Sequence, residues 1–164
     1  MSQKKRILLA VVILCVLVGV ILGVDALGRL RTASVPEAPP PGSIPIYLDG
    51  RLVGNITAGD LEPISEVSFV DEAQGVEQNG WLLRDVILLR VARDKLKPGS
   101  LIHVSSSSRN KAAEVTWAEA EEPANRVMFD LSNRGTLKLV SLLEKLDTRD
   151  EWVQDVDRIE VTTR

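Results

Sequence analysis

Apolar and polar positions divide the chain into an apolar beginning and a longer, mixed remainder. Residues 7–24, ILLAVVILCVLVGVILGV, contain no charged side chain. At ~1.5 Å per residue, a helix of this run measures ~27 Å, close to the ~30 Å hydrocarbon core of a bilayer. Ala26 and Leu27 extend the run, so we predict a transmembrane helix over residues 7–27. A cleaved signal peptide is the alternative, although its apolar region usually has only ~7–15 residues.

Charges beside this segment predict its orientation. Lys4, Lys5 and Arg6 precede it, and Lys and Arg favour the cytoplasmic side of a membrane. We therefore expect residues 1–6 in the cytoplasm, a single-pass anchor in the lipid bilayer of the cell membrane, and the rest of the chain outside. Gly19 and Gly23 have the G-x-x-x-G spacing that lets two helices approach closely, which predicts a homodimer. Glycine is also common in membrane helices that do not pair.

A proline-rich linker separates the anchor from the part of the chain that forms a domain. We assign residues 28–44 to this linker, because its PPP run favours extended polyproline II. It acts as a semi-rigid stalk or, alternatively, as a tether of no set length. Residues 45–164 are then the extracytoplasmic domain.

The first half of this domain alternates as strands do. Residues 44–57, IPIYLDGRLVGNIT, predict a hairpin that turns at Asp-Gly. Thr57 then caps a helical turn, with Asp60 at capping-box spacing. Glu66–Val70 predicts a strand whose return partner begins at Val76. Apolar residues at helical spacing predict a buried helix over 80–92.

In the second half, the pattern predicts strands at residues 101–104, 114–117 and 125–133, and a last strand around Ile159 and Val161. Residues 136–143, TLKLVSLL, fit either a strand or a short helix. Three tryptophans, each with apolar neighbours, are expected in the core: Trp81, Trp117 and Trp152. Short strands mixed with helix predict an α+β fold.

The charge and cysteine content of the chain exclude some classes of binding partner and site. From residue 33 onward the chain has 15 Lys and Arg against 22 Asp and Glu, a net charge of −7. Nucleic acid is therefore not an expected partner, because its binding needs clustered positive charge. The chain's one cysteine, Cys15, lies in the apolar segment, so the domain has no disulfide and no thiolate.

Three stretches follow one another along the chain: ITAGDLEPI, GWLLRDVILL and the terminal WVQDVDRIEV. Together they resemble the molybdopterin-binding oxidoreductase domain of the sulfite oxidase type, over residues 46–161. The resemblance implies a mixed β-sheet domain with a molybdenum site held by a cysteine thiolate. Since the domain has no cysteine, we predict the fold without the redox activity. No cofactor is predicted; molybdopterin follows from the resemblance only.

A non-catalytic domain of this kind is expected to bind a small anionic ligand or an envelope protein. The alternative is a molybdopterin-dependent oxidoreductase, or a subunit of one, with an atypical metal site. No catalytic and no metal-binding residue is predicted from the pattern.

VSSSSRNK, residues 104–111, is the candidate ligand site. Its hydroxyls, backbone N–H groups and two cations suit an anion. The alternative is an ordinary solvated connection between strands. We add His103, which strand alternation places opposite Ile102 and Val104, as a candidate proton shuttle. The predicted ligand-binding residues are Ser105, Ser106, Ser107, Ser108, Arg109, Lys111 and His103.

Overall fold

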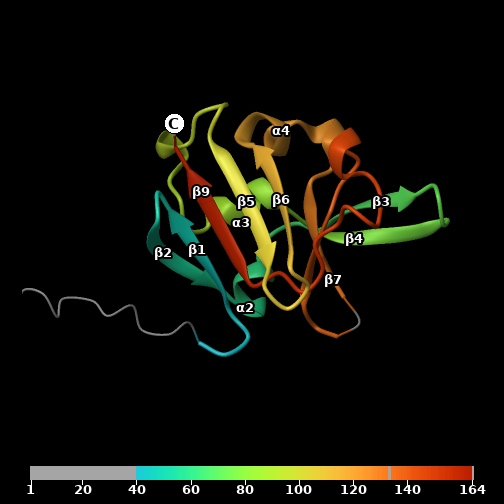
Figure 1. Ribbon diagram of the computed structural model, residues 1–164, viewed down its shortest axis with the longest axis horizontal. Helices are drawn as coiled ribbons and strands as arrows, with labels where there is room; N and C mark the ends of the chain where they lie inside the picture. The colour runs from blue at the N-terminus through green and yellow to red at the C-terminus, as the bar shows by residue number, and fades with distance from the viewer. Residues whose placement is uncertain (1–39, 133, 164) are drawn as a thin grey trace, which may run out of the picture. The chain divides into compact units, whose positions relative to one another are not determined.

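The computed structural model describes residues 40–132 and 134–163. The predicted cytoplasmic end, the membrane segment with Gly19 and Gly23, and most of the linker lie outside the described residues. Within the described ranges, no helix has the length and apolar character needed to span a bilayer. These ranges contain nine strands in two sheets with short helices between them (Figure 1), which confirms the predicted α+β class.

The larger sheet has five strands in the order β2-β1-β9-β5-β6. β1 and β9 are parallel, and every other neighbouring pair is antiparallel. The last strand therefore lies in the middle of the sheet, between two hairpins. The strands are β1 (Ile44–Leu48), β2 (Arg51–Ile56), β5 (Leu101–Ser106), β6 (Lys111–Thr116) and β9 (Arg158–Thr162).

The smaller sheet has four antiparallel strands in the order β3-β4-β7-β8. Its β3–β4 hairpin projects from the rest of the domain (Figure 1). The segment that the sequence left open between strand and helix is strand β8. The strands are β3 (Val67–Asp71), β4 (Val76–Leu82), β7 (Met128–Leu131) and β8 (Leu137–Val140).

Local chemistry explains the turns and helix starts. Asp49 and Gly50 have φ of 49° and 77°, as the predicted hairpin turn requires. The Thr57 N–H donates to the Asp60 carboxylate at 2.9 Å, which closes the predicted cap of α2 (Ala58–Leu61). The same arrangement recurs at Thr116, the cap of α4 (Trp117–Glu121), whose N–H donates to Glu119 at 2.7 Å.

Three 3₁₀ turns complete the described elements: η1 (Arg93–Lys95), η2 (Pro123–Asn125) and η3 (Glu144–Leu146).

The helix predicted over 80–92 is much shorter. β4 continues through Leu82, and α3 covers only Leu83–Leu88. The reason is a distant partner: Gly80 pairs with Asp130 of β7, and a Cβ at Gly80 would lie 1.8 Å from the Phe129 carbonyl oxygen. Helical periodicity cannot reveal such a pairing.

Two predicted strands also change their limits. β6 ends at Thr116, because Trp117 begins α4 instead of ending the strand. β7 is confined to Met128–Leu131, since Pro123–Asn125 forms η2.

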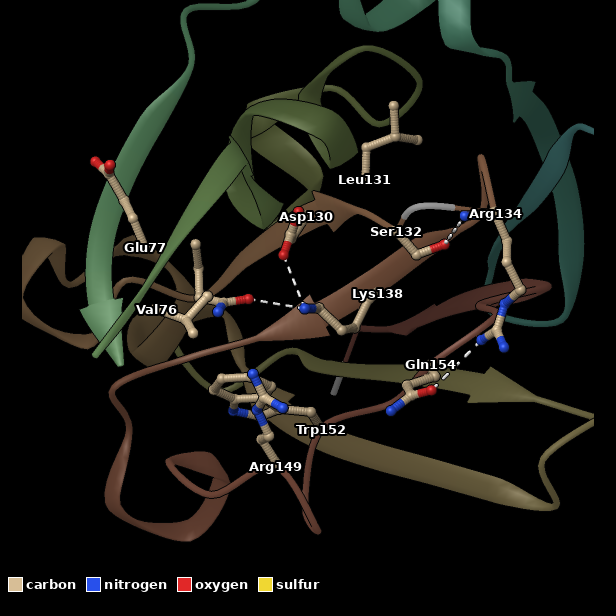
Figure 2. A pocket seen from close by; sticks show the side chains of 11 residues that line it. Val76, Glu77, Asp130, Leu131, Ser132, Arg134, Lys138, Arg149, Trp152 and Gln154 are labelled. Atoms are coloured by element: carbon tan, nitrogen blue, oxygen red, sulfur yellow. Dashed lines mark hydrogen bonds and ion pairs between the residues drawn. The ribbon is translucent and has the colours of Figure 1, made fainter. Parts of the chain in front are cut away.

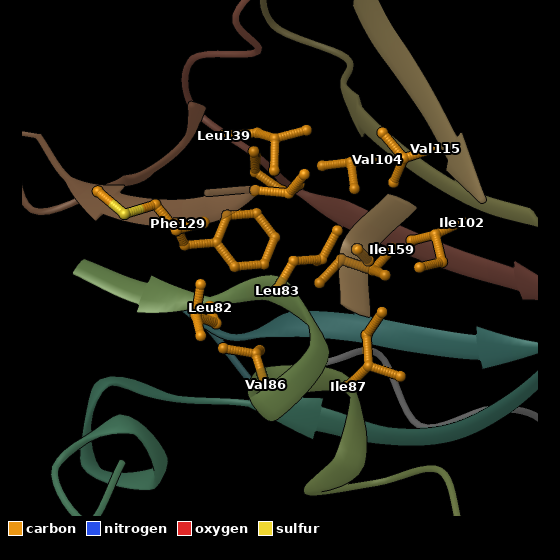
Figure 3. Close-up of a cluster of buried hydrophobic side chains, with 14 of the residues drawn as sticks. Leu82, Leu83, Val86, Ile87, Ile102, Val104, Val115, Phe129, Leu139 and Ile159 are labelled. Carbon is orange, nitrogen blue, oxygen red and sulfur yellow. The ribbon is translucent and has the colours of Figure 1, made fainter. Parts of the chain in front are cut away.

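α3 joins the cores of the two sheets. Its Leu83, Val86 and Ile87 are fully buried. Figure 3 shows these side chains in one cluster with Ile102, Val104, Val115 and Ile159 of the larger sheet and Phe129 and Leu139 of the smaller one. Burying each such side chain contributes about 1.5–3 kcal/mol, so packing stabilises a helix too short to form alone.

The three tryptophans differ in how far they are buried. Trp117 and Trp152 are buried, as predicted. Trp81 packs against the core but remains partly exposed.

Candidate functional site

The predicted serine site lies at the turn between β5 and β6. Ser105 and Ser106 end β5, and Lys111 begins β6. Strand alternation separates the hydroxyls, because Ser106 is buried on the inner face and Ser105 is not. The Ser106 hydroxyl lies 3.2 Å from that of Ser108.

Several donors of this serine turn already have acceptors within the domain. The Ser107 N–H donates to Asp157 at 2.7 Å, and its hydroxyl donates to the same carboxylate. Arg109 Nε donates to Asp155 at 2.6 Å. Lys111 donates to the carbonyl oxygen of Asp150. An external anion would therefore have to displace carboxylates of the loop before β9.

Asp155 is the centre of this arrangement. It accepts hydrogen bonds from Thr136 at 2.7 Å, from Arg109, and from Arg134 at 3.1 Å. These hydrogen bonds, that of Thr136 first, hold the pKa of the Asp155 carboxyl below its usual range. One carboxylate thus ties the serine turn to the turn that precedes β8.

His103 does not join this site. It is exposed on β5 between the buried Ile102 and Val104, which confirms the predicted alternation. Its neighbours across the sheet are Glu114 on β6 and Glu160 on β9.

Residues at the serine turn do not fit a pterin-held molybdenum. Such a metal uses a soft thiolate ligand, whereas the turn offers hydroxyls and cations that are bonded to Asp155 and Asp157. No group of three or more His, Cys, Asp or Glu side chains within residues 40–132 and 134–163 is placed to hold a metal ion.

A second cluster of cations lies on the smaller sheet (Figure 2). A groove of about 470 Å³ opens beside the ends of β4, β7 and β8 and the loop that carries Trp152. We call it the polar groove. Its principal residues are Gln78, Asp130, Arg134, Lys138, Arg149 and Trp152.

Lys138 is the least exposed cation of the groove. Its side chain is only 17% exposed, and its Nζ lies 2.8 Å from the Asp130 carboxylate. It also donates to Gln78 Oε1 at 2.7 Å and lies 5.2 Å from the centre of the Trp152 ring. The ammonium is therefore paired. Because Gln78 accepts through Oε1, the NH₂ group of its amide takes no part in this hydrogen bond.

Two arginines are more accessible. The side chains of Arg134 and Arg149 are 57% and 45% exposed. Arg149 Nε lies 3.5 Å from Asp71, and no acceptor among the described residues makes a hydrogen bond with its guanidinium. Asp71 Oδ2 is itself buried without a hydrogen bond. Arg149 therefore keeps donors for a ligand.

Sequence reasoning missed the groove because its residues come from several separate segments. Gln78 is on β4, Asp130 on β7, Lys138 on β8, and Arg149 and Trp152 are on the loop before β9. One local signal exists: Lys138 stands between Leu137 and Leu139, a cation inside an apolar strand. Which carboxylate and which aromatic ring surround it depends on the fold.

Comparison with known proteins does not add a relative: no family model matches this chain, and no curated protein matches it.

Proposed function

We propose that the domain is a non-catalytic binding module that takes a small anionic ligand in the polar groove. One observation carries this proposal. Three cations, Arg134, Lys138 and Arg149, line one groove of about 470 Å³ against two acids, Glu77 and Asp130. Among the lining residues the cations exceed the acids by one, in a part of the chain whose net charge is −7, and Asp155 and Asp71 pair with Arg134 and Arg149 from outside the lining.

Available donors favour the groove over the serine turn. Arg149 makes only a long ion pair with Asp71, whereas Arg109 makes a hydrogen bond of 2.6 Å with Asp155. An anion in the groove could accept from Arg149 and from the Gln78 amide without breaking an internal hydrogen bond. Charge-assisted hydrogen bonds of this kind are the stronger ones.

The dimensions of the groove suit a metabolite-sized anion. Small-molecule sites typically have ~300–1,000 Å³. Leu131 and Trp152 supply apolar surface beside the cations. We therefore expect a carboxylate or phosphate ester with a short carbon skeleton.

A matched pair of variants tests the location. The full chain would be titrated with citrate and with inorganic phosphate, and binding followed by the change in tryptophan fluorescence and by calorimetry. Arg149→Gln should weaken binding about tenfold, since a charge-assisted hydrogen bond contributes about 1.5 kcal/mol or more. Arg109→Gln should leave binding unchanged. These arginines have similar exposure, 45% and 42%, and each pairs with an aspartate.

The converse result would contradict the proposal. If Arg109→Gln weakens binding and Arg149→Gln does not, the anion site is the serine turn. If neither anion binds the unmodified chain at millimolar concentration, the groove is not an anion site.

The proposal also includes a sulfite-oxidase-type fold and an extracytoplasmic location on a membrane anchor. Three stretches in sulfite-oxidase-type order support a fold of that kind, and the apolar run at residues 7–24 supports a membrane anchor with the domain outside. Resistance of the full chain to alkaline extraction from membranes, with the domain cleaved by protease added outside spheroplasts, is the expected result. Release by alkali would contradict the anchor.

A further inference from the structure

A second cavity, of different character, lies between the two sheets. It has about 420 Å³ and is lined mainly by apolar side chains. We call it the inter-sheet cavity. Its apolar residues include Ile56, Leu61, Trp81, Leu131, Leu137 and Val156.

This cavity has apolar surface available to a ligand. Leu131 is 50% exposed although it is a large apolar residue on a strand. Trp81 is partly exposed, unlike the buried Trp117 and Trp152. Aromatic and aliphatic side chains left accessible in a concave site are typical of ligand-binding pockets.

The charged side chains that line the cavity are negative. The only charged residues that line it are Asp155 and Asp157, within the described part of the chain. Asp155 is already bonded to Thr136, Arg109 and Arg134.

Asp157 is different. Its Oδ2 accepts from Ser107, while no donor of the described residues reaches its Oδ1. A carboxylate with one oxygen outside these hydrogen bonds thus lines an apolar cavity.

From this juxtaposition we infer that the inter-sheet cavity binds a small hydrophobic ammonium ion. The apolar body packs against Trp81 and Leu131, and the ammonium donates to Asp157. Charge complementarity selects this class: a carboxylate would meet Asp155 and Asp157, and a neutral ligand would leave Asp157 Oδ1 without a donor. The cavity adjoins the polar groove at Leu131, which lines both, but the cations of the groove disfavour the same ligand.

The probe is 2-phenylethylammonium, compared with 2-phenylethanol, its neutral counterpart of similar shape. Both would be titrated into the full chain in lipid nanodiscs, and the indole N–H signals of the three tryptophans followed by NMR. Loss of one signal in Trp81→Phe assigns it. The ammonium should move the Trp81 signal and bind about fivefold more tightly than the alcohol, as expected for one partly exposed ion pair.

Two variants separate charge from shape. Asp157→Asn keeps an acceptor for Ser107 and should remove the preference for the ammonium. Ala58→Trp places a large side chain at an exposed helix residue that lines the cavity, and should prevent binding of both probes. Equal affinity for the two probes in the unmodified chain, or shifts confined to Trp117 and Trp152, would overturn the inference. So would a preference that survives Asp157→Asn.

Discussion

At the scale of single residues, Gly80 shows how a missing side chain fixes the fold. The β4–β7 pairing brings the Phe129 carbonyl oxygen to 1.8 Å from the place where a Cβ would stand. No rotamer change relieves this contact, because the opposing atom belongs to the backbone. The smaller sheet can therefore form only with glycine here.

We predict that Gly80→Ala lowers the free energy of unfolding by about 3 kcal/mol, the upper range for overpacking. Gly99→Ala is the control, since a Cβ there meets nothing within 4 Å. Urea denaturation of both variants checks this. A loss at Gly80 no larger than that at Gly99 would refute the β4–β7 register.

Asp60 is a residue whose charge supports the fold. Hydrogen bonds from Thr57, and then from Arg90 at 2.5 Å, lower the pKa of Asp60 to about 2 from 3.8. Above its unfolded pKa of ~3.9, Asp60 is ionised in both states and its stabilisation is fully present. As the pH falls through the folded pKa, that stabilisation is lost.

Asp60→Asn should therefore be less stable than the unmodified chain at pH 6. The difference should shrink from about pH 4 downward, because at pH 2 half of the folded-state Asp60 carboxyls are already protonated. Urea midpoints at pH 6, 4 and 3 measure it. A difference that is independent of pH would show that the carboxylate charge has no role.

At the scale of elements, the loop before β9 works as a clamp. It carries Asp155, which holds the serine turn through Arg109 and the turn before β8 through Thr136 and Arg134. Both turns belong to antiparallel hairpins, but to different sheets. The loop thus links the two sheets at one edge of the domain.

Asp155→Asn should loosen this link. We expect several-fold faster hydrogen exchange at Ser107–Lys111 and at Thr136, with the core strands unchanged. Asp150→Asn is the control, because only the backbone carbonyl of Asp150 takes part in the contact. Unchanged exchange in Asp155→Asn would mean that the hydrogen bonds of this carboxylate do not hold the turns.

Elements also show what sequence can predict. The β1–β2 turn and the α2 cap were predictable because Asp49-Gly50 and Thr57 with Asp60 act on the nearest residues. The helix predicted over 80–92 is too long because Gly80 pairs with Asp130 of β7, some fifty residues away. The serine turn is predicted as an anion site from its own residues, whereas the carboxylates that accept from it, Asp155 and Asp157, lie about fifty residues away.

At the scale of the whole molecule, β9 holds the larger sheet together. It pairs with β1 on one side and β5 on the other, so both hairpins depend on the last strand. Its Ile159 and Val161 are fully buried.

Deleting residues 158–164 should leave the domain unfolded, as judged by circular dichroism and by loss of dispersed NMR signals. Deleting only residues 163–164 is the control and should cost little, because the side-chain hydrogen bonds of Thr163 within the described residues go to Asp49 alone. A folded product of the longer deletion would contradict the central place of β9.

The parallel alignment of β1 with β9 also has a mechanical consequence. A force that pulls the start of β1 away from the end of β9 acts along both strands in opposite directions, so it loads their hydrogen bonds in shear, together instead of one after another. If the chain is tethered through its beginning and drawn from its end, this strand pair will be the element that bears the tension.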